Sequence, residues 1–239
     1  MSMLDRFELW LKENTTLADS TIEHYKRAVK ATSNDMLSIG VIHKNLSDMS
    51  LVELDIAINN ISNNPDFIAK NKIGNRMYSA GLARYRYFLM LTDSVEENIN
   101  EDELIGDVAA TEKEVIVKSR IGQGAYRSKL IRKYNSQCIV TGINHPKLLV
   151  ASHIKPWSAC SNEERIDVSN GLLLSSNMDK LFDCGLITFD NGGRMKVSKF
   201  VGTNNEQILN VYNGLEVDLK ATSDLLKYLE YHRDILFIK

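Results

Sequence analysis

A change in the sign of the charge near the middle of the chain most constrains how it can fold. Residues 93–114 contain nine acidic residues and one base, whereas residues 116–133 contain six bases and no acid. The acidic stretch has little apolar periodicity, which is typical of a linker that runs into a basic surface, although two solvated faces would give the same pattern. We therefore expect two folded units, residues 1–92 and 115–239, joined by an acidic linker over residues 93–114.

Length and composition bound the class of protein. The 239 residues, of which 44% are hydrophobic, can bury one sizeable core or two small ones. No apolar run approaches the roughly 20 residues that span a bilayer, and the opening "MSMLDRFELW" is acidic where a secretory signal would be basic and then apolar. We therefore expect a soluble, cytoplasmic protein with no membrane partner. Its three cysteines include no C-x-x-C pair, so they are expected to be ordinary buried thiols.

The first 92 residues show helical periodicity and no strand alternation. Ser20, with Glu23 three residues later, predicts a capping box at the start of the second helix. Bases and aromatic residues alternate between Arg76 and Tyr87, as they do on a nucleic-acid-binding face. The texture faintly resembles the helical DNA-clamping domain of tyrosine recombinases, but a bundle with a mixed surface explains it equally well. We expect an all-α domain for DNA recognition or dimerisation.

The second half mixes short strands and helices. "AYRSKLIRKYN" predicts a basic amphipathic helix, and "QCIVTGINHPKLLVASHI" predicts a strand, a turn and a second strand. "NMDKLFDCG" predicts a short helix that ends at Gly185, and "LITFDNGGRMKVS" predicts a hairpin. "TSDLLKYLEYHRDIL" predicts a closing helix capped by Ser223. The predicted fold class is α+β: an all-α domain followed by an α+β domain.

His153 lies at the end of the apolar run "LLVASHIKPW", which Pro156 would terminate. From this stretch alone a buried structural histidine is the commoner reading. Asp179 and Asp183 follow with helical spacing, so they share one face and repel each other unless a divalent cation lies between them. Alternatively, Asp183 ends the helix and Asp179 is simply solvated. Together with Asn170, these residues supply the base, amide and acidic ligands that metal-assisted phosphodiester hydrolysis uses.

Five blocks of the second half occur in a characteristic order: "RIGQGAYRSKL", "CIVTG", "ASHIKPW", "NGLLLSSNMDKLFDCGLITF" and "YLEYHRDILF". Over residues 115–239 the sequence resembles the HNH endonuclease family, in its restriction-type branch. The resemblance implies a ββα-metal finger, in which two strands and a helix hold one divalent ion. It implies that His153 is the general base and that Asn170 orients the finger. Asp179 would bind the metal, with Asp183 as second ligand or as its orienting partner.

The sequence departs from the family pattern at three points. Ser152 stands where many relatives place a histidine or aspartate ligand, so it is at best a weak ligand. The last motif position is Asp179 rather than histidine, which favours Mg²⁺ or Mn²⁺ over Zn²⁺. "CIVTG" retains only Cys138 of the four-cysteine zinc site found in some relatives, so no structural zinc is expected.

Further residues have predicted supporting roles. Trp157 is expected to pack in the core. His232 and Arg233 match the family's terminal block and could support the active site, although a surface helix end would explain them almost as well. The basic block before the finger is expected to hold DNA phosphates through Arg120, Gln123, Arg127 and Lys129.

These observations predict a DNA endonuclease of restriction type, dependent on a sequence or on a modified base. Cutting both strands needs two active sites, so a homodimer on double-stranded DNA is expected. Ser152 is the main reason to keep an alternative, a non-catalytic DNA-binding or regulatory protein that retains the fold. A homing-type nuclease with a long recognition site is a third reading.

Overall fold

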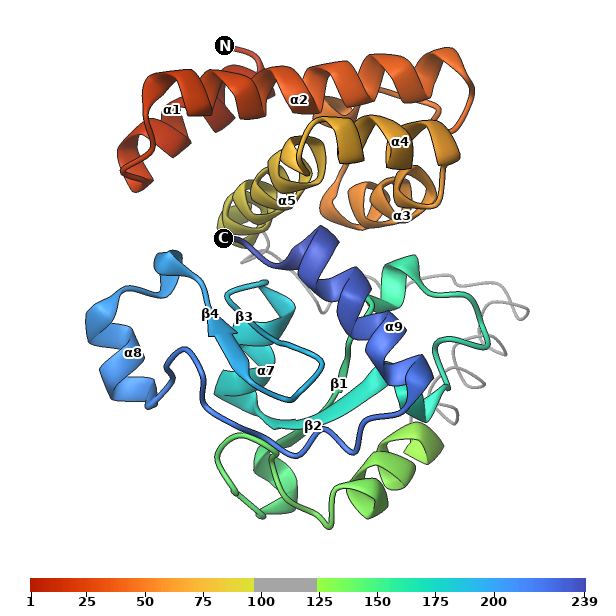
Figure 1. Ribbon diagram of the computed structural model, residues 1–239, viewed down its shortest axis with the longest axis vertical. Coiled ribbons are helices and arrows are strands. Elements are labelled where there is room, and N and C mark those ends of the chain that lie inside the picture. The colour runs from red at the N-terminus through yellow and green to blue at the C-terminus, as the bar shows by residue number, and fades with distance from the viewer. Residues whose placement is uncertain (97–123) are drawn as a thin grey trace.

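The structure, a computed structural model, describes residues 1–96 and 124–239. A helical first half precedes a second half of short strands and helices (Figure 1), as predicted. Most of the acidic stretch 93–114 lies outside the described residues, as do Arg120 and Gln123. No helix in the described part of the chain is long and apolar enough to cross a membrane.

The first half is a bundle of five helices. Its large buried side chains include Phe7, Leu11, Leu54 and Tyr85, all with no exposed surface. The helices are α1 (Met3–Asn14), α2 (Asp19–Ser38), α3 (Leu51–Ser62), α4 (Pro65–Ile73) and α5 (Met77–Glu96).

Helix α2 does not begin where the sequence predicted. Ala18 is its N-cap residue and its carbonyl accepts from two backbone amides of the first turn, so Ser20 lies inside the helix and caps nothing. The predicted capping box at Ser20 and Glu23 is therefore wrong. Capping boxes form instead at the starts of α1 and α3, where Ser2 and Ser50 accept from the third residue of each helix.

The second half is built on two antiparallel hairpins. β1 (Leu149–His153) pairs with β2 (Gly171–Ser175), and His153 lies opposite Gly171. α7 (Ser176–Asp183) follows β2 directly and packs against both strands. The remaining elements are a helix over residues 124–133, β3 (Ile187–Phe189), β4 (Met195–Val197), α8 (Thr203–Leu209) and α9 (Ser223–Tyr231).

Two details of this half differ from the predictions. "CIVTG" forms no strand: the amide of Gly142 donates to Cys138 (2.9 Å) and Gly142 has a φ of 70°, so the segment turns tightly despite its β-branched residues. The second strand of the finger is instead β2. Thr222, not Ser223, caps α9, because its side chain accepts from the amide of Leu225 (3.2 Å). The predicted hairpin, the end of α7 and the three buried free cysteines are confirmed.

The end of the chain joins the two halves. After α9, a π-helix (His232–Leu236) leads to a segment in which Ile238 donates its amide to the carbonyl of Gly185 (2.9 Å). Gly185 has a φ of 69°, and a Cβ there would lie 2.1 Å from the carbonyl oxygen of Leu236. Ile235 and Leu236 pack into the core of the helical half, which the blue C-terminal segment reaches in Figure 1.

His232 is fully buried beneath this segment. Its ring stacks on Phe182 with centroids 3.8 Å apart, Nε2 lies 3.0 Å from the carbonyl of Phe182, and Nδ1 lies 2.9 Å from the hydroxyl of Thr188. A carbonyl only accepts, so Nε2 donates and Nδ1 accepts from Thr188. Burial lowers the pKa of His232 to about 3, so the ring is neutral in the folded protein.

This buried histidine predicts a stability that depends on pH. The folded-state pKa lies below the unfolded value of 6.5, so the unfolded chain binds the extra proton and stability is lost as the pH falls below 6.5. By pH 5 the protein should lose about 2 kcal/mol through this group. Urea unfolding across pH 5–8 should show that His232→Gln removes this part of the pH dependence. An unchanged dependence in the variant would contradict the assignment.

Candidate functional site

His153 ends β1 with its ring held on three sides. The ring stacks on Tyr126 (centroids 4.4 Å apart, planes 12° apart) and meets the edge of Trp157 (5.5 Å, 76°). Nε2 lies 3.0 Å from the backbone carbonyl of Arg165. Because a carbonyl can only accept, Nε2 carries the proton of the neutral ring and Nδ1 keeps its lone pair.

The free nitrogen of His153 reaches solvent. Nδ1 has no hydrogen-bond partner among the described residues, and it is not one of their fully buried unpartnered polar atoms. Burial lowers the pKa of His153, and the hydrogen bond to Arg165 only partly opposes this. A neutral imidazole with an accessible lone pair is the form in which a histidine accepts a proton from water.

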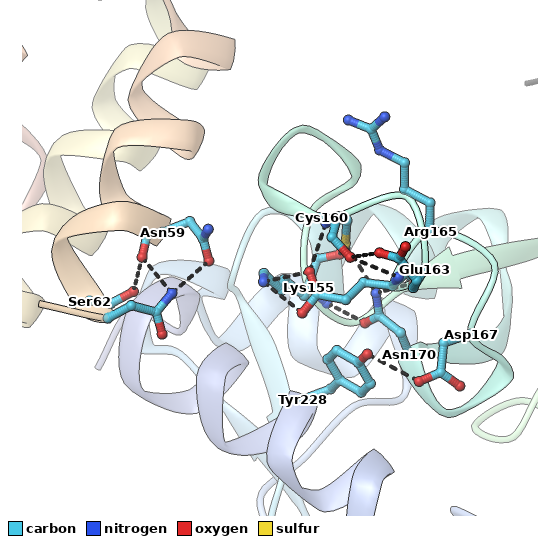
Figure 2. A network of polar contacts seen from close by, with 12 residues as sticks. Asn59, Ser62, Lys155, Cys160, Glu163, Arg165, Asp167, Asn170 and Tyr228 are labelled. Atoms are coloured by element: carbon cyan, nitrogen blue, oxygen red, sulfur yellow. Dashed lines mark hydrogen bonds and ion pairs between the residues drawn. The ribbon is translucent and has the colours of Figure 1, made fainter. Parts of the chain in front are cut away.

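Asn170 organises the loop that follows His153. The residue is completely buried between the loop and β2. Its Oδ1 accepts from the amide of Lys155 (2.9 Å), and its Nδ2 donates to the carbonyl of Glu164 (3.1 Å) and to the thiol of Cys160 (3.2 Å) (Figure 2). One side chain thus holds both ends of the loop.

Other side chains reinforce the same loop. The ammonium of Lys155 lies 2.8 Å from both carboxylate oxygens of Glu164, and the guanidinium of Arg165 lies over the ring of Trp157 (4.7 Å). The hydroxyl of Tyr126 donates to the carbonyl of Asn170 (2.9 Å). These contacts fix the loop, and the loop fixes the Arg165 carbonyl that holds His153.

Asp179 lies on α7 beside β1 and is half-buried. Its burial raises its pKa, the neighbouring carboxylate of Asp183 raises it further, and a hydrogen bond from Ser152 lowers it. Asp183, at the last position of α7, is exposed. The helix and the strand thus bring the Ser152 hydroxyl and two carboxylates to one side of the finger.

This donor set fits a hard divalent cation. All three groups offer oxygen, and a cation between the carboxylates would turn their repulsion into attraction. Within residues 1–96 and 124–239, no group of three or more histidine, cysteine, aspartate or glutamate residues could hold a metal ion. A cation here would therefore complete its shell with Ser152 or water.

Two of the predicted phosphate-binding residues, Arg127 and Lys129, differ in their surroundings. The guanidinium of Arg127 donates to the carbonyls of Leu149 and Pro146 (both 2.7 Å), so it holds the start of β1. Lys129 is exposed on the helix over residues 124–133. Contact of either residue with DNA remains a prediction.

His232 and Arg233 contact α7 and the β3–β4 hairpin. His232 supports α7 through the carbonyl of Phe182. Arg233 donates to the carbonyl of Phe189 (3.0 Å) and the side chain of Asn191 (2.8 Å), and so braces the β3–β4 hairpin.

The middle of the predicted nucleic-acid face of the helical half is buried. Arg84 and Arg86 are each 4% exposed and Tyr85 is fully buried, while Arg76 pairs with Asp234. α5 packs against other helices of the bundle and against the π-helix of the second half, so its arginines are used inside the protein. The prediction of a DNA-binding face is therefore wrong for Arg84, Tyr85 and Arg86.

The geometry agrees with a comparison with known families. Residues 138–190 match the family model of the HNH endonucleases. This HNH region contains β1, β2, α7 and β3, together with His153, Asn170 and both aspartates. The predicted family is thus confirmed for these residues. No curated protein matches the chain.

Sequence reasoning missed several residues of the site. Tyr126 lies in the segment "RIGQGAYRSKL", whose pattern does not show that its ring stacks on His153 and its hydroxyl donates to the carbonyl of Asn170. Glu164 and Arg165 carried no recognised motif. The run of charged residues in "NEERID" is a local signal, but it does not show which carbonyl faces the histidine.

Tyr126 packs over Gly171 so closely that a side chain there should be costly. A Cβ at Gly171 would lie 2.2 Å from the hydroxyl of Tyr126 and 2.7 Å from Leu130. Gly171→Ala should therefore destabilise the protein by about 1–3 kcal/mol in urea unfolding. Gly124→Ala is the matched control, because a Cβ at Gly124 meets nothing within 4 Å. Equal stability of the two variants would refute this packing.

Proposed function

We propose that the protein is a DNA endonuclease that hydrolyses phosphodiester bonds with one divalent metal ion and His153 as general base. The observation that carries the proposal is the form of His153 within the HNH region: Nε2 is held by the Arg165 carbonyl and Nδ1 is open to solvent. A fixed tautomer with one accessible lone pair suits the removal of a proton from a water molecule.

The chain's own residues support this step. Nδ1 of His153 would take the proton of the attacking water, and the carbonyl of Arg165 would stabilise the positive charge that the ring gains. Tyr126 and Trp157 restrict the ring to this orientation. Asn170 fixes the loop that supplies the carbonyl, so it acts through His153 and not on the substrate.

Asp179 and Asp183 would hold the cation, with Ser152 as a weak third donor. A bound Mg²⁺ or Mn²⁺ would stabilise charge on the phosphate and on the departing 3′ oxygen. The products would carry a 5′-phosphate and a 3′-hydroxyl. The chemistry of the oxygen donors supports Mg²⁺ or Mn²⁺ in preference to Zn²⁺.

We further propose restriction of double-stranded DNA in the cytoplasm, with a specific sequence or a modified base as the target. The resemblance to the restriction-type branch supports this class. Two copies of the chain would supply the two active sites that a double-strand cut needs. Residues 1–92 would form a recognition or dimerisation domain, and the exposed Lys129 would contribute to phosphate binding.

A plasmid-nicking assay with Mg²⁺ or Mn²⁺ tests the function. Unmodified and cytosine-modified duplex DNA should both be offered, because the target is part of the proposal. His153→Ala should lower the cleavage rate by about 10²-fold or more. His145→Ala is the matched control, since His145 is an exposed histidine of the same half.

Two results would count against the proposal. Equal cleavage by wild type and His153→Ala would remove His153 as the base. No cleavage of any DNA would favour the alternative, a non-catalytic DNA-binding protein that retains the fold. The observation behind this alternative is Ser152, a hydroxyl near Asp179 at the position where a stronger ligand would be expected.

The proposed metal ligands predict a change in metal requirement. Asp179→Asn removes one of two carboxylates and should raise the Mn²⁺ concentration for half-maximal binding about tenfold or more. Asp218→Asn, at an exposed aspartate of the same half, should leave it unchanged. Titration followed by the electron paramagnetic resonance of free Mn²⁺ measures this without DNA. An unaltered titration in Asp179→Asn would exclude it as a ligand.

A further inference from the structure

A buried ion pair connects the helical half to the HNH region. Arg86 of α5 and Asp55 of α3 are 4% and 7% exposed. Nε and Nη2 of Arg86 lie 2.6 Å and 3.2 Å from the two carboxylate oxygens of Asp55, a bidentate geometry. Both residues belong to the first half, but each also makes a hydrogen bond to the second half.

Each member of the pair has a second contact across the boundary. The hydroxyl of Ser158 donates to Asp55 Oδ2 (3.1 Å), and Nη1 of Arg86 donates to the backbone carbonyl of Asp183 (3.2 Å). Ser158 lies in a 3-10 turn (Trp157–Ala159) five residues after His153, and Asp183 is the last residue of α7. One ion pair thus touches both flanks of the proposed site.

These contacts are suited to fixing the distance between α7 and the turn that contains Ser158. A carbonyl in the last turn of a helix has no partner within the helix, and Arg86 supplies one. A planar guanidinium bonded to Asp55 along one edge has its remaining nitrogen fixed in direction. Moving α7 relative to the turn at Ser158 would break one of the two contacts.

Stability alone gives little reason for such a pair. Removing two charges from water costs free energy that their attraction often only balances, and apolar side chains of similar volume commonly stabilise as well. The gain from the pair is therefore geometric, and the geometry it defines is that of the loop after His153 against the metal-binding end of α7.

We infer that Asp55 and Arg86 are positioning residues that set the proposed base-bearing loop and the proposed metal ligands of α7 at their working separation. The inference rests on the proposed function. It makes the helical half part of the active-site framework as well as a candidate for recognition. Substitutions at this pair should change metal binding and turnover while leaving DNA affinity unchanged.

Two variants distinguish the hydrogen bond to Ser158 from the hydrogen bond to Asp183. The double variant Asp55→Leu/Arg86→Met keeps the volume but removes both links, and Ser158→Ala removes only the link to the loop. The control is Asp35→Leu/Lys70→Met, which removes an ion pair between α2 and α4. All are compared as full-length proteins at a temperature well below their measured melting points.

The double variant should weaken Mn²⁺ binding, read from free Mn²⁺ by electron paramagnetic resonance, about tenfold or more, and should slow single-turnover DNA cleavage to a similar extent. Ser158→Ala should slow cleavage severalfold but leave Mn²⁺ binding unchanged, because the Arg86 contact to α7 remains. The control should match wild type in both measurements, and all variants should bind DNA as wild type does in metal-free buffer.

Wild-type Mn²⁺ binding and cleavage in both variants would overturn the inference. If the double variant fails to fold, cleavage by Ser158→Ala at the wild-type rate is sufficient to overturn it. A wild-type protein that cuts no DNA would instead refute the proposed function, and Mn²⁺ binding by the double variant would still decide whether the pair positions α7.

Discussion

The three hydrogen bonds of the Asn170 side chain are the interaction on which the proposed site depends. A primary amide offers an acceptor and two donor hydrogens in one plane, and Asn170 uses them on an amide, a carbonyl and a thiol. Aspartate would have the same shape but no donor, which would leave the carbonyl of Glu164 without this buried partner. The chemistry of the loop therefore calls for asparagine at this position.

The other residues of the site are positioned by contacts with the loop that Asn170 holds. The loop held by Asn170 presents a carbonyl to Nε2 of His153, and Tyr126 stacks on one face of the ring. Beneath it, β2 continues into α7, so the strand that begins beside Asn170 also places Asp179. The base and the carboxylates are thus positioned by adjoining segments of one small hairpin-and-helix unit.

The sequence revealed the parts of the fold whose signals are local. Helical periodicity identified the first half, and the segment "NMDKLFDCG" with its closing Gly185 identified α7. The glycines at 192 and 193 marked the hairpin. "CIVTG" was misjudged because β-branched residues suit a strand but do not prevent a turn around Gly142.

Contacts between distant segments were beyond reach of the sequence. The alternating arginines and tyrosines of α5 look the same whether they face DNA or another helix, because composition does not say which face is covered. Arg86 could be understood only once Asp55, 31 residues earlier, was beside it. The role of Arg165 could not be predicted either, because its backbone carbonyl contacts His153 and any residue type would supply that group.

That last contact determines what kind of change the site can tolerate. Any amino acid at position 165 supplies a carbonyl, so substitution there leaves the partner of His153 chemically intact. The spacing between His153 and Asn170 is different, because one inserted or deleted residue would shift which carbonyl faces the ring. The loop between His153 and Asn170 should therefore tolerate substitution at position 165 far better than an insertion or a deletion.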